Sequence, residues 1–252
     1  MSATVRVTVW NEFVHERLER EPNAARAHYP NGLHETIREG LHRVAADRFD
    51  IATATLDEPA AGLPSEVLDR TDVLVWWGHV RHEQVPDDVV RRVVDRVLGG
   101  MGLVVLHSGH ASRVFRRLMG TTCTLSWRHS GDTELIWTLD PGHPIAAGVP
   151  QPLVIPRHET YGEPFDVPVP DELIFVSGFS GGEVFRSGCL YRRGRGTVFY
   201  FSPGDQSFPV YHQDDVLRVI ANGVEHVAPR HPVGPPPPGA PRVSAHLPGV
   251  SA

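Results

Sequence analysis

Strand-like and helix-like segments alternate through the first 120 residues, and this alternation restricts the chain to few folds. Apolar, largely β-branched runs at residues 5–10, 51–56, 72–77 and 102–106 predict strands. Between them, apolar residues recur at helical spacing from Leu33 to Val44, from Pro86 to Val97 and from Ser112 to Met119. Apolar strands separated by amphipathic helices form parallel sheets that are covered on both faces. The sequence therefore predicts an α/β fold.

The second half of the chain has a different pattern. Short apolar segments at residues 133–138, 172–176, 183–185 and 197–201 are separated by Gly and Pro, which predicts additional antiparallel strands. A last helix is expected from Asp214 to Val224. We expect one domain over residues 1–228, followed by a flexible Pro-rich tail over residues 229–252.

The composition excludes several classes of function. The net charge of -6 gives no basic footprint, so we expect no nucleic-acid partner. Two cysteines, no signal-peptide pattern and no apolar run near the roughly 20 residues that cross a bilayer predict a cytoplasmic protein without membrane contact. Fifteen histidines are unusual, and imidazole is suited both to proton transfer and to metal binding. Codon bias and ordinary surface positions account for many of them.

Polar residues follow several predicted strands directly. In open parallel sheets, ligands bind beyond the carboxyl ends of the strands. This rule selects the following residues: Glu12, His15, His79, His107, His110 and Asp205.

His107 has the most informative position, because it lies where a buried strand turns sharply into a helix. Such an elbow exposes one side chain at the strand end. The imidazole could be a general base or a metal ligand, or it could cap the next helix or satisfy a buried hydrogen bond. The surrounding residues do not form G-x-S-x-G, which disfavours Ser108 as a serine nucleophile.

Six separated segments together resemble the ThuA family of trehalose-utilisation proteins. They span most of residues 5–228, and agreement across all of them is more specific than any single match. The segments are VWNE at 9–12, DVLVWWGH at 72–79, GMGLVVLHSGH at 100–110, HPIAAG at 143–148, ETYGEPF at 159–165 and GEVFRSGC at 182–189.

The resemblance implies a flavodoxin-like fold of the class I glutamine amidotransferase type and a role in trehalose use. Amidotransferases carry a nucleophilic Cys at the elbow, where this chain has His107, and neither Cys123 nor Cys189 lies at an elbow, so glutamine hydrolysis is not expected. The chain departs from the family pattern at Asp205, where relatives usually have His. His212 could supply the missing imidazole, or it could be a solvated residue at a helix start.

Glu159 and Tyr161 stand two apart on an extended stretch, so both side chains could point into the same crevice, and Glu163 could join them. The alternative is a polar loop. Trp10 and Trp77 lie at strand ends, where an aromatic face could stack on a sugar or could pack in the core. The arginines between Arg192 and Gly196 could bind substrate or form a charged hairpin turn.

We therefore expect an enzyme acting on trehalose-derived or other 3-keto-glycosides by acid-base, isomerase, lyase or hydrolase chemistry. A non-catalytic sugar-binding or regulatory protein is the alternative. A zinc ion would be bound by His79 and His107, and no nucleotide cofactor is expected. Homo-oligomers and a partner sugar dehydrogenase are the expected protein partners. The expected catalytic residues are His107, Glu159, Tyr161 and Asp205, and the expected substrate-binding residues are Trp10, Glu12, Trp77, His110 and His212.

Overall fold

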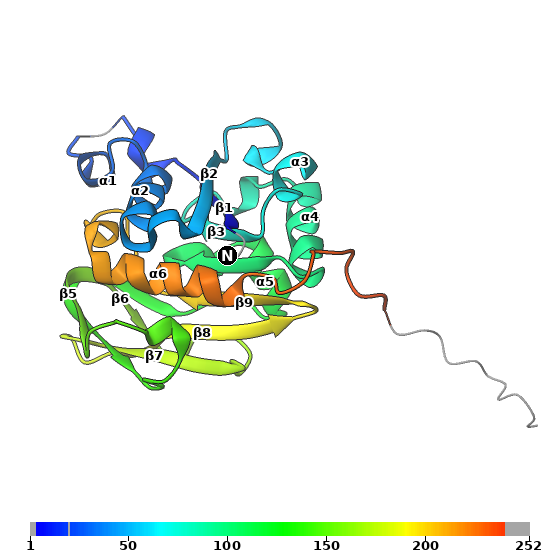
Figure 1. Cartoon of the computed structure of the whole chain (residues 1–252). Coiled ribbons are helices and arrows are strands. Elements are labelled where there is room, and N and C mark those ends of the chain that lie inside the picture. Colours follow the sequence, from blue (N-terminus) through cyan, green and yellow to red (C-terminus); the bar gives the residue numbers. More distant parts are fainter. Residues whose placement is uncertain (1–3, 20, 240–252) are drawn as a thin grey trace, which may run out of the picture.

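A single nine-stranded sheet organises the computed structural model, which describes residues 4–19 and 21–239 (Figure 1). The strand order is β2-β1-β3-β4-β9-β8-β7-β5-β6. Five neighbouring strands are parallel, namely β2 (Phe49–Thr55), β1 (Val5–Asn11), β3 (Val73–Trp77), β4 (Gly102–Leu106) and β9 (Gly196–Phe201). The predicted α/β class, with a parallel sheet in the first half, is confirmed.

Helices cover both faces of the parallel strands. Successive side chains of a strand point to opposite faces of the sheet, so neighbouring residues pack against different helices. On one face, Val73 and Val75 pack with α2 (Leu33–Ala45) and α6 (Asp214–Val227). On the other, Leu74 and Trp76 pack with α3 (Ser65–Leu68), α4 (Asp87–Leu98) and α5 (Arg113–Met119). The short helix α1 (Ala24–His28) lies beside α2 (Figure 1).

The second half extends the sheet with antiparallel strands, as predicted, except that residues 197–201 belong to β9, which pairs in parallel with β4. The antiparallel strands are β8 (Val184–Arg193), β7 (Glu172–Phe179), β5 (Ser126–Thr138) and β6 (Leu153–Gly162). The prediction was too short for β5 and β8, and it did not include β6. Residues 193–196 connect β8 to β9 as a hairpin, which agrees with the turn interpretation of this arginine-rich segment.

The chain after α6 follows the surface of the domain for several residues. Val233 is partly buried against the core, and the Gly234 N–H donates a hydrogen bond to the Gly99 carbonyl over 3.1 Å. The rest of the predicted tail, residues 240–252, lies outside the described residues.

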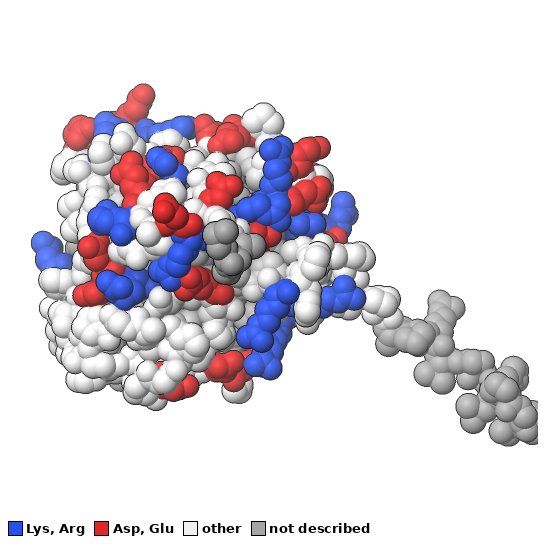
Figure 2. All heavy atoms as spheres, viewed as in Figure 1, with Lys and Arg blue, Asp and Glu red and all other residues white. Residues whose placement is uncertain are grey.

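Charged side chains of both signs are mixed over the helices, and no large patch of one sign is visible on the face drawn in Figure 2. No helix in the described part of the chain is long and apolar enough to cross a membrane.

Candidate active site

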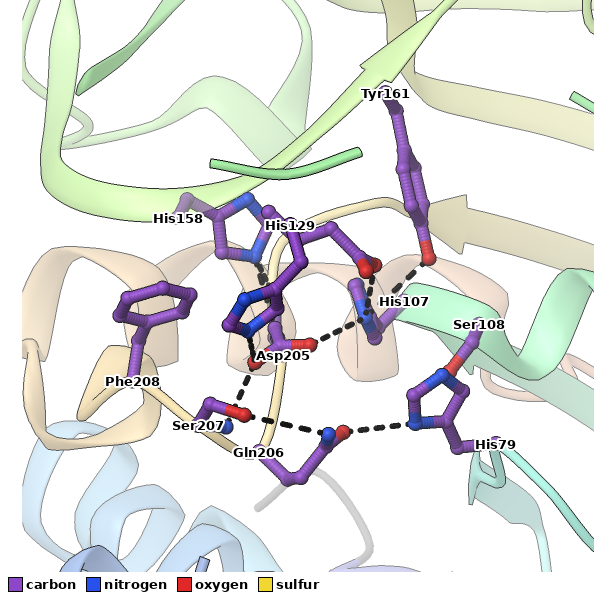
Figure 3. A network of polar contacts seen from close by, with 12 residues as sticks. His79, His107, Ser108, His129, His158, Tyr161, Asp205, Gln206, Ser207 and Phe208 are labelled. Atoms are coloured by element: carbon purple, nitrogen blue, oxygen red, sulfur yellow. Dashed lines mark hydrogen bonds and ion pairs between the residues drawn. The ribbon is translucent and has the colours of Figure 1, made fainter. Parts of the chain in front are cut away.

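The turn after β4 places His107 at the carboxyl edge of the sheet (Figure 3). His107 opens a short 3-10 helix, His107–Ala111, and its φ of 48° is left-handed. A non-glycine residue in this region costs roughly 1–3 kcal/mol, and such strain is concentrated at functional sites. The side chain is fully buried, and its Nδ1 lies 3.0 Å from the carbonyl oxygen of Ser202.

Three side chains from distant parts of the sequence surround Nε2 of His107. Glu159 and Tyr161 come from β6, and Asp205 comes from the loop after β9. The Nε2 atom lies 3.3 Å from Glu159 Oε2, 3.7 Å from Asp205 Oδ2 and 3.3 Å from the Tyr161 hydroxyl. The four residues named as catalytic from the sequence therefore lie in one buried cluster.

Charge and burial oppose each other in this cluster. Burial alone would lower the pKa of His107, but the nearby carboxylates of Asp205 and Glu159 outweigh it and raise the pKa to about 10. Burial would raise the pKa of each carboxyl group, yet the nearby imidazole holds both pKa values below their usual range. Burial raises the pKa of Tyr161 well above its usual value, so its hydroxyl stays protonated.

A second histidine, His158, fixes the loop that carries Asp205. Its Nε2 accepts hydrogen bonds from the backbone N–H groups of Gly204 (2.9 Å) and Asp205 (3.2 Å). Its Nδ1 lies 2.8 Å from Glu134 Oε2, and Glu134 Oε1 accepts a hydrogen bond from Ser177. Neither His158 nor Glu134 was predicted as a site residue from the sequence.

Gly204 permits the tight path of the same loop. Its φ is +140°, and a Cβ atom at this position would overlap the Tyr211 hydroxyl. Its carbonyl accepts a hydrogen bond from Trp77 Nε1 over 3.0 Å. The glycine therefore joins the Asp205 loop to the end of β3.

Gly204→Ala is expected to lower the free energy of unfolding by roughly 3 kcal/mol or more, because it adds backbone strain to overpacking. Urea denaturation measures this loss. The matched control is Gly120→Ala, since Gly120 also has a positive φ but a Cβ atom added there would meet no atom within 4 Å. Equal losses in the two variants would show that contact with Tyr211 is not what constrains this loop.

The outer side of the cluster is formed by imidazoles and an exposed indole. His79 Nδ1 lies 2.9 Å from Gln206 Oε1, and half-exposed His129 has its Nε2 3.7 Å from Asp205 Oδ1. Trp127 is 65% exposed and stands opposite Tyr161 in the β5–β6 ladder. Residues directly opposite in a ladder share a face of the sheet. Sequence reasoning missed Trp127, His129 and Gln206.

The structure groups potential metal-ligand atoms differently from the pair expected from the sequence. Three potential ligand atoms lie within 4.8 Å of one another, one each from His107, Glu159 and Asp205. His79 does not belong to this group, because its Nδ1 faces Gln206 and its ring centroid is 6.0 Å from that of His107. The pairing of His79 with His107 as two metal ligands stays a prediction, and His107 with two carboxylates is a second possible ligand set.

Two tryptophans named as substrate-binding residues lie in the core instead. Trp10 is 1% exposed, stacks on Trp76 and donates its Nε1–H to the Ala61 carbonyl. Trp77 is fully buried. Neither indole has an exposed face on which a sugar could stack, because helices cover both faces of their strands.

Glu12 and His110, which were also named as substrate-binding residues, are buried and contact other parts of the site. Buried Glu12 accepts hydrogen bonds from the backbone N–H groups of Val80 and Arg81, so it fixes the loop that carries His79. His110 contacts Tyr161 edge-on, and its Nδ1 lies 2.7 Å from the Cys123 carbonyl. Burial lowers the pKa of His110 to about 3. Its imidazole is therefore neutral at physiological pH.

His212 lies away from the cluster contacts. It is exposed, stacks on Tyr29, and its Nε2 lies 2.8 Å from the His28 carbonyl. It lines a cavity of about 750 Å³ together with Arg157 and Phe208. It therefore does not supply an imidazole beside Asp205.

Neither cysteine thiol is activated. Cys123 and Cys189 are both buried, and burial raises their pKa values to about 11 and about 12. Thiols with such pKa values stay protonated near neutrality and are poor nucleophiles.

Comparisons with known proteins find similar solved structures and one matching family profile. Similar solved structures include a ThuA-like protein from Bacteroides uniformis, with 14% identity, a TM-score of 0.61, and coverage of 94% of this chain and 96% of that one. A ThuA-like protein from Parabacteroides merdae has 13% identity and a TM-score of 0.61, covering 95% and 94% of the two chains. Cytoplasmic protein STM3548 from Salmonella typhimurium has 12% identity and a TM-score of 0.57, covering 90% and 100%.

At these identities the structural likeness establishes the fold alone, and a comparison with curated proteins finds no match. The sequence profile described as "ThuA: Trehalose utilisation" matches residues 6–227. Because that match covers most of the chain, the protein belongs to the ThuA family.

Proposed function

We propose that this protein is an enzyme of carbohydrate metabolism that acts on trehalose-derived or other 3-keto-glycosides. The family description, trehalose utilisation, supports a sugar as the substrate. The observation that carries the enzymatic part is the convergence of His107, Glu159, Tyr161 and Asp205 within hydrogen-bond or ion-pair distance. A binding protein does not require buried carboxylates held against an imidazole.

The chemistry of a 3-keto-glycoside suits this set of groups. A ketone acidifies the adjacent C–H bond, so isomerisation or elimination needs a base, an acid and a group that stabilises the enolate. Glu159 is the base in this proposal, and the protonated Tyr161 hydroxyl and the His107 imidazole are donors to the enolate oxygen. Asp205 holds the imidazole in place. These roles follow from the chemical types and distances of the groups.

Trp127 is the proposed sugar-stacking residue in place of the buried tryptophans. Its ring is exposed, and it lies on the same face of the sheet as Tyr161. Indole rings stack on the apolar faces of sugars, as their large, flat surface is weakly hydrated. The substrate would then enter past His129.

Further expectations form part of the same proposal. The order of the parallel strands, β2-β1-β3-β4-β9, corresponds to the flavodoxin-like order 2-1-3-4-5, which supports a fold of the class I glutamine amidotransferase type. We place the protein in the cytoplasm, as a homo-oligomer that receives its ketone substrate from a sugar dehydrogenase.

The proposed function is tested by incubating the purified protein with trehalose and, separately, with trehalose oxidised at C3. Proton NMR follows both sugars over time. The expected result is consumption of the 3-keto sugar well above its rate without protein, with trehalose unchanged. If neither sugar is consumed faster than in buffer, the proposal is wrong.

A further inference from the structure

The tautomer of His107 is set by its neighbour at Nδ1. The Ser202 carbonyl oxygen lies 3.0 Å from this nitrogen and can only accept a hydrogen bond, so Nδ1 carries a proton. Nε2 carries the second proton of the charged ring, and a metal ion that displaced this proton would meet the lone pair of Nε2. That lone pair would face Glu159 Oε2 and Asp205 Oδ2, which are themselves lone-pair atoms.

Burial makes this arrangement costly unless a cation joins it. Glu159 is 3% exposed and Asp205 is fully buried. Asp205 Oδ2 accepts no hydrogen bond from any group in the described part of the chain. Two buried carboxylates without compensation are strongly unfavourable. A proton on His107 Nε2 offsets the negative charge of one of the two carboxylates. A single divalent ion would neutralise both carboxylates, and it would bind the lone pairs of His107 Nε2, Glu159 Oε2 and Asp205 Oδ2.

The distances suit such an ion. Zinc binds imidazole nitrogen and carboxylate oxygen at about 2.0–2.2 Å, which places tetrahedral ligand atoms about 3.3–3.6 Å apart. The two separations measured from Nε2, 3.3 and 3.7 Å, are close to this spacing. On the other side of the His107 ring, Nδ1–H donates a hydrogen bond to the Ser202 carbonyl. Metal-binding histidines are commonly oriented by a bond of this kind.

We propose that His107, Glu159 and Asp205 form a three-ligand site for one divalent ion of the zinc class. Three protein ligands leave a coordination position for water or a substrate oxygen, as in catalytic zinc sites. When bound, the ion would supply Lewis-acid stabilisation of a developing oxyanion. With the ion bound, Glu159 and His107 would be ligands and not the base and the donor of the metal-free reaction proposed above, so the metal site does not depend on that reaction.

A second group of potential ligands provides a contrast. His143, Glu172 and His226 also have ligand atoms within 4.8 Å of one another. However, His143 Nδ1 accepts a hydrogen bond from the Ile145 N–H over 3.1 Å, so the proton of its neutral ring lies on Nε2, which is 3.3 Å from Glu172 Oε2. A metal at Nε2 would leave the proton of the neutral ring on Nδ1, where it would face the Ile145 N–H instead of an acceptor. The second group is therefore an internal control.

The test is metal binding without any sugar. Purified protein is stripped with a chelator and titrated with Zn²⁺ by calorimetry, and Co²⁺ absorption reports the coordination. We expect one ion per chain for the wild type and for His143→Ala. Asp205→Asn and Glu159→Gln should weaken Zn²⁺ binding by at least about tenfold. Loss of a group that only supports a metal ligand already weakens binding by about this factor, and these two residues are proposed as ligands themselves.

The wild-type titration requires no variant to fold, and circular dichroism checks the folding of the others. Absence of stoichiometric binding by the wild type would overturn the metal site. So would unchanged affinity in folded Asp205→Asn, or loss of binding in folded His143→Ala. Since no sugar is present, these results are independent of whether the proposed enzymatic activity is found.

Discussion

Asp205→Asn is expected to lower turnover of a 3-keto-glycoside by roughly 100- to 10,000-fold, the range typical for loss of a group in acid-base catalysis. The substitution keeps an oxygen that can accept the hydrogen bond from the Ser207 N–H, so the loop retains its shape. It removes the negative charge beside His107 Nε2. The imidazole then loses the partner that holds its charge and position.

The rate is measured by proton NMR at saturating substrate, so that turnover is separated from binding. Asp214→Asn is the matched control, because Asp214 pairs with Arg43 on the surface of α2 and α6. Surface ion pairs contribute little, so this variant should retain wild-type turnover. If Asp205→Asn also retains it, Asp205 has no role in the reaction.

Glu134→Ala is expected to lower the free energy of unfolding by roughly 3 kcal/mol or more, because two buried polar groups lose the carboxylate that they face and each such loss costs about 1–3 kcal/mol. Glu134 and His158 are both buried; His158 Nδ1 lies 2.8 Å from Glu134 Oε2, and the Ser177 hydroxyl donates a hydrogen bond to Glu134 Oε1. Chemical denaturation measures the loss. Glu134→Gln keeps an acceptor oxygen and should cost less.

The same substitution should reach the active site, because His158 also holds the backbone of Gly204 and Asp205. A loss below about 1 kcal/mol, the size of an ordinary surface pair, would mean that the pair between Glu134 and His158 does not support the fold. The same result would also mean that this pair does not link β5 to the loop that carries Asp205.

The sequence was sufficient to predict the parallel strands β1 to β4 and the position of His107, but it placed residues 197–201, the parallel strand β9, among the antiparallel strands. Apolar strands and amphipathic helices are local patterns, and the elbow after residue 106 is local too. The edge strand β6 was missed because it contains Pro156, Arg157 and His158 in a row. Proline is tolerated on edge strands, where one side of the backbone needs no partner, so the strand has no strong local signal.

Side-chain direction and long-range pairing account for the remaining differences. Trp76 and Trp77 point to opposite faces of a sheet that is covered on both sides, whereas Trp127 lies in the exposed first part of β5. His79 follows a strand as His107 does, but its imidazole turns toward Gln206. Glu134 and His158 meet only through the β5–β6 pairing and its bulges. No spacing in the sequence encodes these contacts.

The proposed enzyme uses the buried cluster around His107 for proton transfer next to a sugar ketone. The most direct test follows deuterium uptake from D2O into C2 of the 3-keto sugar by NMR, with wild type and His107→Ala compared. Uptake or turnover is expected with the wild type, and neither is expected with the folded variant. Equal reaction with both proteins would contradict the proposal, because the chemistry would then not depend on the residue at the centre of the site.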